Sequence, residues 1–183
     1  MAMPSPCPDE WQRAAITRDG VPYRIRPIRT EDVQREAEFI RGLSEESRYS
    51  RLMYALREPS PAQIDKLVQV DYRGTMAFVA VVGMLSDEYF IGVARYAADP
   101  TGLACEFAIV IADSWQSRGI GTTLMHLLFE YSRGQGFERM YGTVLAGNQR
   151  MIELANWLGL ESRTCPDDPR LVEASRNLKD QLP

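Results

Sequence analysis

The segment CEFAIVIADSWQSRGIGTTLM, residues 105–125, decides the fold. Its apolar residues from Cys105 to Ala112 predict a strand, and Gly119 and Gly121 open a helix that runs to about Arg133. The first N–H groups of such a helix have no partner within it, and the helix dipole favours negative charge there. The strand-to-helix turn therefore predicts an anion site that suits a pyrophosphate.

Two common phosphate motifs do not fit this turn. The dinucleotide fingerprint needs a third glycine where Thr123 or Leu124 stands, and the ATP-binding P-loop needs Gly-Lys-Ser/Thr. The phosphate carrier is therefore expected to be neither NAD nor ATP. A glycine pair that only tightens the turn is the structural alternative.

The chain around this segment predicts an α/β protein with a central mixed, mostly antiparallel sheet flanked by helices, because successive strands are joined by short turns. The Ser60–Gln63 capping box predicts the start of one helix. Strands are expected at 21–28, 76–83, 89–96, 105–112, 139–144 and 170–174, and helices at 30–42, 44–52, 61–70, 119–133 and 148–158. We expect a disordered proline-rich tail (1–20), one domain (21–175) and a polar tail (176–183).

Composition excludes several function classes. With 21 basic and 25 acidic residues, the net charge of -4 argues against nucleic acid and anionic membranes as partners. The longest apolar run falls far short of the roughly 20 residues of a membrane-spanning helix. The three cysteines are widely spaced and form no C-x-x-C, so we expect no metal site and a reducing, cytoplasmic setting.

The motif Gln116-x-x-Gly119-x-Gly121 after an apolar strand resembles the coenzyme A signature of the GNAT family of N-acetyltransferases. The stretch NQRMIELANWLGL, from Asn148 to Leu160, resembles the family's following helix, which begins with a cofactor-contacting asparagine. RIRPIRTED (24–32), LSEESRYSR (43–51) and VDYRGTMAFVAV (70–81) extend the resemblance over about residues 22–160. These stretches look most like the GNAT domain of bacterial Pat-type protein-lysine acetyltransferases.

The resemblance implies a GNAT-type fold, acetyl-CoA as co-substrate and Glu106 as the general base. Pat-type domains are usually fused to a regulatory or synthetase-like module. The residues before Val21 are too few to fold as one, so we expect any such regulation on another chain or not at all. The implied cofactor-binding residues are Ile109, Ile111, Gln116, Ser117, Arg118, Gly119, Ile120, Gly121, Thr122 and Asn148.

Glu106 is singled out by spacing as well. The strand from Cys105 is apolar in both of its alternating sets, so it is expected to be covered on both faces, where a carboxylate is costly unless paired or useful. The alternative is an ion pair: if the turn Asp99–Gly102 centres the hairpin, Glu106 falls opposite Arg95. The two interpretations are not exclusive.

Four other residues bear on the chemistry. Many GNAT enzymes have a tyrosine at the position of Ala155 that protonates the leaving thiolate, so either coenzyme A leaves here as a thiolate or another group such as Tyr141 helps. His126, the single histidine, is expected to be solvated on the outer face of its helix. Cys105 is expected to be a buried structural thiol.

We therefore expect an acetyl-CoA-dependent N-acetyltransferase whose acceptor is a protein lysine, an acyl-CoA synthetase being one candidate. A small-amine N-acetyltransferase and a non-catalytic module that binds or senses acetyl-CoA are the alternatives. Of the 21 basic residues only Lys66 and Lys179 are lysines. Because Lys179 falls in the expected tail, it is predicted to be acetylated by the protein itself before Lys66.

Overall fold

Eight strands form a single mixed sheet in the computed structural model, which describes residues 6–52, 59–84 and 87–179. The strand order is β1-β2-β3-β4-β5-β6-β8-β7, and β5 with β6 is the one parallel pair. The mixed, mostly antiparallel sheet predicted from the short turns is confirmed. The strands are β1 (Arg13–Ile16), β2 (Pro22–Pro27), β3 (Thr75–Val82), β4 (Tyr89–Ala98), β5 (Ala104–Ile111), β6 (Arg139–Leu145), β7 (Glu161–Cys165) and β8 (Asp168–Asn177).

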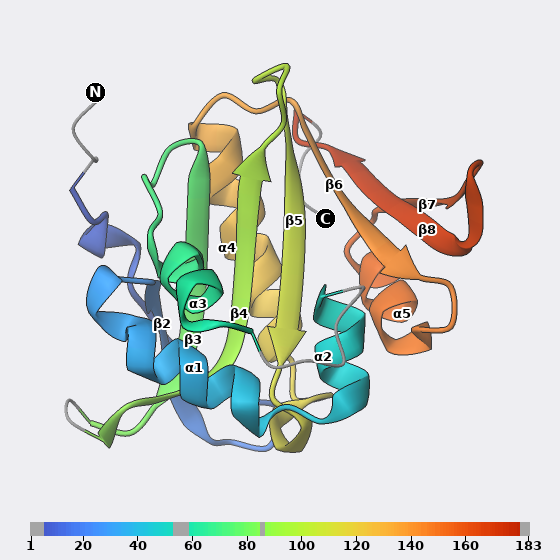
Figure 1. Ribbon diagram of the computed structural model, residues 1–183. Coiled ribbons are helices and arrows are strands. Elements are labelled where there is room, and N and C mark those ends of the chain that lie inside the picture. Colours follow the sequence, from blue (N-terminus) through green and yellow to red (C-terminus); the bar gives the residue numbers. More distant parts are fainter. Residues whose placement is uncertain (1–5, 53–58, 85–86, 180–183) are drawn as a thin grey trace.

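Helices cover both faces of this sheet (Figure 1). On one face α1 (Val33–Gly42) and α3 (Pro61–Val68) bury an apolar cluster that includes Phe39, Ile64 and Val79. On the other face α4 (Ile120–Gly134) buries the larger cluster, which includes Phe78 and Leu128. The remaining helices are α2 (Glu45–Leu52), which contacts β5, and α5 (Gln149–Trp157), which contacts β7.

The predicted capping box is present at the start of α3. The Gln63 backbone N–H donates to Ser60 Oγ over 3.4 Å, and the Ser60 N–H donates to Gln63 Oε1 over 2.8 Å. Pro61 occupies the first turn, where its missing N–H costs nothing. The helix ends at Val68, two residues earlier than predicted.

The two ends of the chain differ from expectation. Residues 13–16, expected in a disordered tail, pair with β2, and Trp11 stacks edge-to-face on Tyr131 with ring centroids 5.0 Å apart. The proline content of residues 1–20 suggested disorder, whereas the order of this segment depends on the contact of Trp11 with Tyr131, which is distant in sequence. At the other end β8 continues to Asn177 and Leu178 is 3% exposed, so the ordered domain extends beyond residue 175. The short polar strand β7 was not predicted because its side chains are mostly exposed and carry no alternation.

The parallel strands β5 and β6 stay paired over only three residues. Their ladder runs from Ala104 opposite Arg139 to Glu106 opposite Tyr141, whereas β5 continues to Ile111 and β6 to Leu145. Figure 1 shows the two strands diverging below this point. The sheet therefore opens into a wedge whose walls carry unpaired backbone on the facing edges.

A buried cluster of charges joins β2 to the connection between β3 and β4. The Arg26 guanidinium bonds Asp32 Oδ2 at 2.7 Å and Glu88 Oε1 at 2.5 Å, and the three side chains are 5%, 2% and 8% exposed. Burial is the largest single effect and would raise the pKa of Asp32, but the hydrogen bonds from Arg26 and the Arg29 N–H, together with the charges of Arg26 and Arg35, lower that pKa. The carboxylate is therefore stabilised in its charged form.

We predict that Asp32→Asn lowers the free energy of unfolding by about 3 kcal/mol at pH 7, because it leaves buried Arg26 with one partner fewer. The pKa of folded Asp32 lies below its unfolded value of about 3.9, so this stabilisation is present above that pH and is lost as the pH falls through the folded value. Urea unfolding at several pH values measures both effects. Glu161→Gln, which breaks the exposed pair with Arg163, is the control and should change stability little; equal losses in the two variants would contradict the prediction.

Candidate functional site

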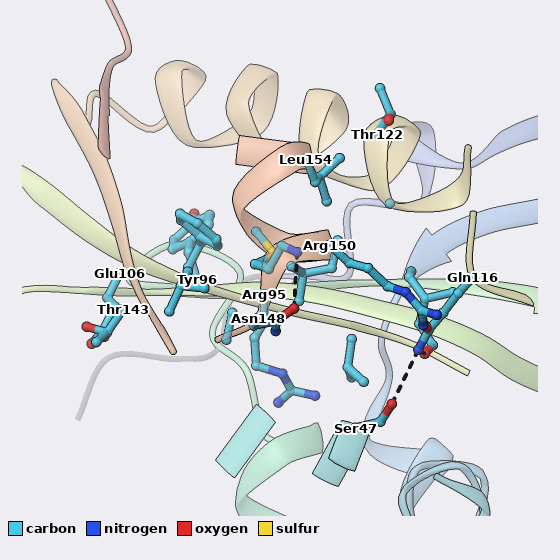
Figure 2. Close-up of a pocket in the computed structure, with 18 of the residues that line it drawn as sticks. Ser47, Arg95, Tyr96, Glu106, Gln116, Thr122, Thr143, Asn148, Arg150 and Leu154 are labelled. Carbon is cyan, nitrogen blue, oxygen red and sulfur yellow. Dashed lines mark hydrogen bonds between the residues drawn. The ribbon is translucent and has the colours of Figure 1, made fainter. Parts of the chain in front are cut away.

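A cleft of about 890 Å³ occupies the wedge between β5 and β6 (Figure 2). One wall is β5 from Glu106 onward, and the other consists of Thr143 on β6 and the first turns of α5 from Asn148. The start of α4 closes one end of the cleft, and the last turn of α3 lines it as well. The cleft therefore lies where the sequence places the expected cofactor residues.

The edge of β5 presents free backbone to this cleft. The Ala112 N–H donates to the Ile91 carbonyl, and the Ala104 carbonyl accepts from the Asp99 N–H. The backbone groups of the even-numbered residues of β5 are therefore directed toward β4. Backbone groups alternate along a strand, so Ile109 and Ile111 direct theirs toward the wedge. The Ile111 carbonyl accepts from Gln116 Nε2 at 3.1 Å, which leaves the N–H groups of Ile109 and Ile111 to face a ligand.

The turn into α4 brings further N–H groups to the same place. Ser117 and Gly119 both have positive φ values, 62° and 89°, which turn the chain sharply from β5 into the helix. The first hydrogen bond of the helix joins Thr123 N–H to the Gly119 carbonyl at 3.2 Å, so the amides before Thr123 are available. A Cβ on Gly121 would lie 3.3 Å from Leu154 Cδ2. These residues fit a pyrophosphate that approaches bare backbone.

Gln116 ties three elements together across the cleft (Figure 2). Its amide donates to the Ile111 carbonyl and to Ser47 Oγ on α2 at 3.3 Å, while Arg150 on α5 donates to its Oε1. Asp113 adds to this chain, because its carboxylate accepts from both Ser44 and Ser47. Sequence reasoning missed Ser44, Ser47 and Asp113; the cap-forming Ser44 was the available signal.

Two of the implied cofactor residues do not line the cleft with their side chains. Arg118 pairs with Asp19 at 2.9 Å and lies over the Trp115 ring, and Ile120 is buried in the core at 1% exposure. Neither side chain is directed into the cleft in this structure. Asn148 lines the cleft and caps α5, since its Oδ1 accepts from Met151 N–H at 3.1 Å; its NH₂ group faces outward from the cap. The other implied residues, Ile109, Ile111, Gln116, Ser117, Gly119, Gly121 and Thr122, line the cleft.

The structure contradicts the proposed ion pair between Glu106 and Arg95. Asp99 closes the hairpin against Ala104, so four residues rather than two form the loop, and the register moves by two. Ala97 therefore lies opposite Glu106, and Arg95 pairs instead with Glu36 at 2.6 Å.

The expectation that β5 is covered on both faces is also wrong at Glu106, which is exposed where the wedge begins. Its carboxylate makes no hydrogen bond or ion pair with any residue in the described ranges. It stands free on the wall of the cleft, on the same face of the sheet as α1 and α3.

The remaining residues of interest are placed as follows. Cys105 is fully buried and burial raises its pKa to about 12, which confirms a structural thiol. His126 is half-buried rather than solvated, and burial, with the charge of Arg176, lowers its pKa. Tyr141 lies beside Glu106 in the ladder, and burial together with the charge of Glu106 raises its pKa. Ala155 is fully buried against the core.

Comparison with known proteins identifies the class that this fold and cleft define. The model of the acetyltransferase (GNAT) family matches residues 39–160, so the chain belongs to the GNAT acetyltransferase family. The chain is 40% identical over 164 residues to an acetyltransferase of Pseudomonas aeruginosa, covering 90% of this chain and 87% of that one.

Two further relatives point to one group within the family. The acetyltransferase Pat of Mycolicibacterium smegmatis is 30% identical over 143 residues, which make up 78% of this chain but 42% of that protein. The GNAT domain of S. lividans PAT has the same fold, with a TM-score of 0.85 over 93% of this chain and 98% of that domain, at 24% identity. The resemblance to Pat-type GNAT domains is confirmed.

The chain is thus an enzyme of the acetyl-CoA-dependent N-acetyltransferase class. In the described ranges, no group of three or more His, Cys, Asp or Glu side chains is placed to hold a metal ion. None of the helices in those ranges has the length and apolarity needed to cross a membrane.

We predict that Gly121→Asp raises the Kd for acetyl-CoA by about tenfold or more, because a carboxylate would stand among the amides that receive the pyrophosphate. Isothermal titration calorimetry measures the change. Gly134→Asp at the far end of α4, where nothing lies within 4 Å of an added Cβ, is the matched control. Unchanged affinity in the Gly121 variant would place the pyrophosphate elsewhere.

Proposed function

We propose that this protein transfers an acetyl group from acetyl-CoA to the side-chain amine of a protein lysine by direct attack, with Glu106 as the general base. The observation that carries the proposal is the free carboxylate of Glu106 on the wall of the cleft, beside a strand edge with unpaired N–H groups. A base and amide donors on one strand are the two parts that amine acetylation requires.

Acetyl-CoA fits the residues that line the cleft. The amides at the start of α4 and the NH₂ of Asn148 would hold coenzyme A, the former at its pyrophosphate. The N–H groups of Ile109 and Ile111 would bond the extended pantetheine arm as a further strand bonds an edge. Acetyl-CoA supplies the acyl group as a thioester when bound.

The side chain of Glu106 then removes a proton from the acceptor amine. A lysine ammonium, with an ordinary pKa of about 10.4, cannot attack until it loses a proton. The exposed carboxylate accepts that proton directly or through one water molecule. The neutral amine attacks the thioester carbonyl, and an N–H group of β5 stabilises the oxyanion that develops.

The leaving group departs without a dedicated acid. Ala155 is buried and its methyl group has no ionisable proton, so the residue at the position of the usual tyrosine cannot act as a general acid in this chain. Tyr141 stands next to Glu106 but its raised pKa makes it a weak acid. Departure of coenzyme A as a thiolate is therefore favoured, since a thiol has an ordinary pKa of about 8.5.

A protein acceptor is supported by the mouth of the cleft. Trp157 lines it while 71% exposed, a large apolar side chain that a partner surface would cover. Glu46 and Glu153 line the same cleft and suit a cationic acceptor segment. The kinship with Pat adds to this support. The proposal includes a reducing cytoplasmic setting, consistent with the free thiols of Cys7, Cys105 and Cys165.

We predict that Glu106→Gln lowers kcat by about 100-fold or more while it leaves the Kd for acetyl-CoA and the melting temperature nearly unchanged. The amide keeps the size of the side chain but accepts no proton. Steady-state kinetics on a lysine peptide, with calorimetry and thermal unfolding, measures all three quantities.

Glu130→Gln, an exposed carboxylate on α4, is the matched control and should retain full activity. A small-amine panel run in parallel tests the acceptor class. Full activity of the Glu106 variant would remove it as the base, and turnover of small amines with none of peptides would replace the protein-lysine acceptor.

A further inference from the structure

Lys66 lies inside the proposed acetyltransferase cleft. It is an exposed residue on the last turn of α3, and it lines the same cleft as Glu106. It forms no ion pair with residues in the described ranges. Lys179, the other lysine, lies outside the cleft and pairs with Glu138 at 2.7 Å. The expectation that Lys179 is modified first therefore loses its basis, because β8 and buried Leu178 fix the chain beside it.

The end of α3 is held against the sheet next to Glu106. Arg95 donates to the carbonyl of Leu67 over 2.9 Å, and its other guanidinium nitrogen pairs with Glu36 at 2.6 Å in a buried environment. Arg95 stands two residues along β4 from Ala97, which lies opposite Glu106. The backbone beside Lys66 is thus anchored to a β4 residue that lies two positions from the one opposite Glu106.

This anchoring limits what Lys66 can reach. Its side chain has four methylene groups, turns about flexible bonds and already lines the cleft, so it can move within the cleft without unfolding α3. No partner chain has to bind first, because the amine belongs to a residue that already lines the cleft together with Glu106. The fold therefore reduces the entropic cost of bringing the amine and the thioester together.

We propose that Lys66 is a modification site at which the protein acetylates itself, within one chain. The inference rests on the proposed function, because it uses the same base and the same thioester. The ammonium of Lys66 gives one proton to Glu106, and its nitrogen forms a bond to the acetyl carbonyl carbon. The carbon–sulfur bond then breaks, and the products are acetyl-lysine, coenzyme A and one released proton.

The experiment incubates the full chain with acetyl-CoA alone and follows each lysine by peptide mass spectrometry over time and over a dilution series. We expect Lys66 to be acetylated well before Lys179, at a rate per molecule that does not change on dilution. Lys179 serves as an internal control for non-enzymatic acetylation, since its side chain is 64% exposed. Glu106→Gln should slow the modification of Lys66 by about 100-fold and leave that of Lys179 unchanged.

A lysine peptide is assayed with the same preparation, so that the two proposals are judged separately. Peptide acetylation without acetylation of Lys66 overturns the inference and leaves the proposed function standing. Equal modification of both lysines, or a rate that rises in proportion to protein concentration, also overturns it. Failure of both acceptors overturns the proposed function together with the inference. Lys66→Arg and Lys179→Arg, each checked for folding by thermal unfolding, assign the total acetyl incorporation to one position.

Discussion

The parting of β5 from β6 is the constraint on which the rest of the structure depends. Two parallel strands that remained paired would satisfy each other's backbone groups and leave nothing to bind a ligand. Here the ladder ends at Glu106 and Tyr141, and the edge beyond it is free. Glu106 lies where the ladder ends, the N–H groups of Ile109 and Ile111 lie along the freed edge, and the turn into α4 follows the end of β5, so the cleft forms where the pairing stops.

An opening in a sheet needs support, and polar side chains supply it. Gln116 spans from the end of β5 to α2 and receives a hydrogen bond from α5, so both walls of the wedge are joined at its open end. Asp113 fixes the start of α2 to the same region through Ser44 and Ser47. These contacts connect α2 to the loop between β5 and α4.

Local patterns in the sequence predicted most of the elements, and strand pairing accounts for most of the errors. Capping by Ser60, turn formation at Asp99–Gly102 and the glycines before α4 are set by neighbouring residues, and all three were correct. The register of β4 with β5 depends on the length of the loop between them. Because that loop is two residues longer than expected, Ala97 and not Arg95 lies opposite Glu106. Strands β1 and β7 each pair with the next strand in the chain, β2 and β8, but neither has the apolar alternation that would have revealed it.

The buried guanidinium groups of Arg26 and Arg95 have a consequence for chemical selectivity. A guanidinium stays protonated at every physiological pH, so it supplies positive charge without a nucleophilic lone pair. Arg95 lines the cleft where a thioester would stand, yet it offers nothing for that thioester to acylate. The fold thus keeps structural charge and nucleophilic amines on different residues, and among the described side chains that line the cleft only Lys66 carries an amine that an acyl group could modify.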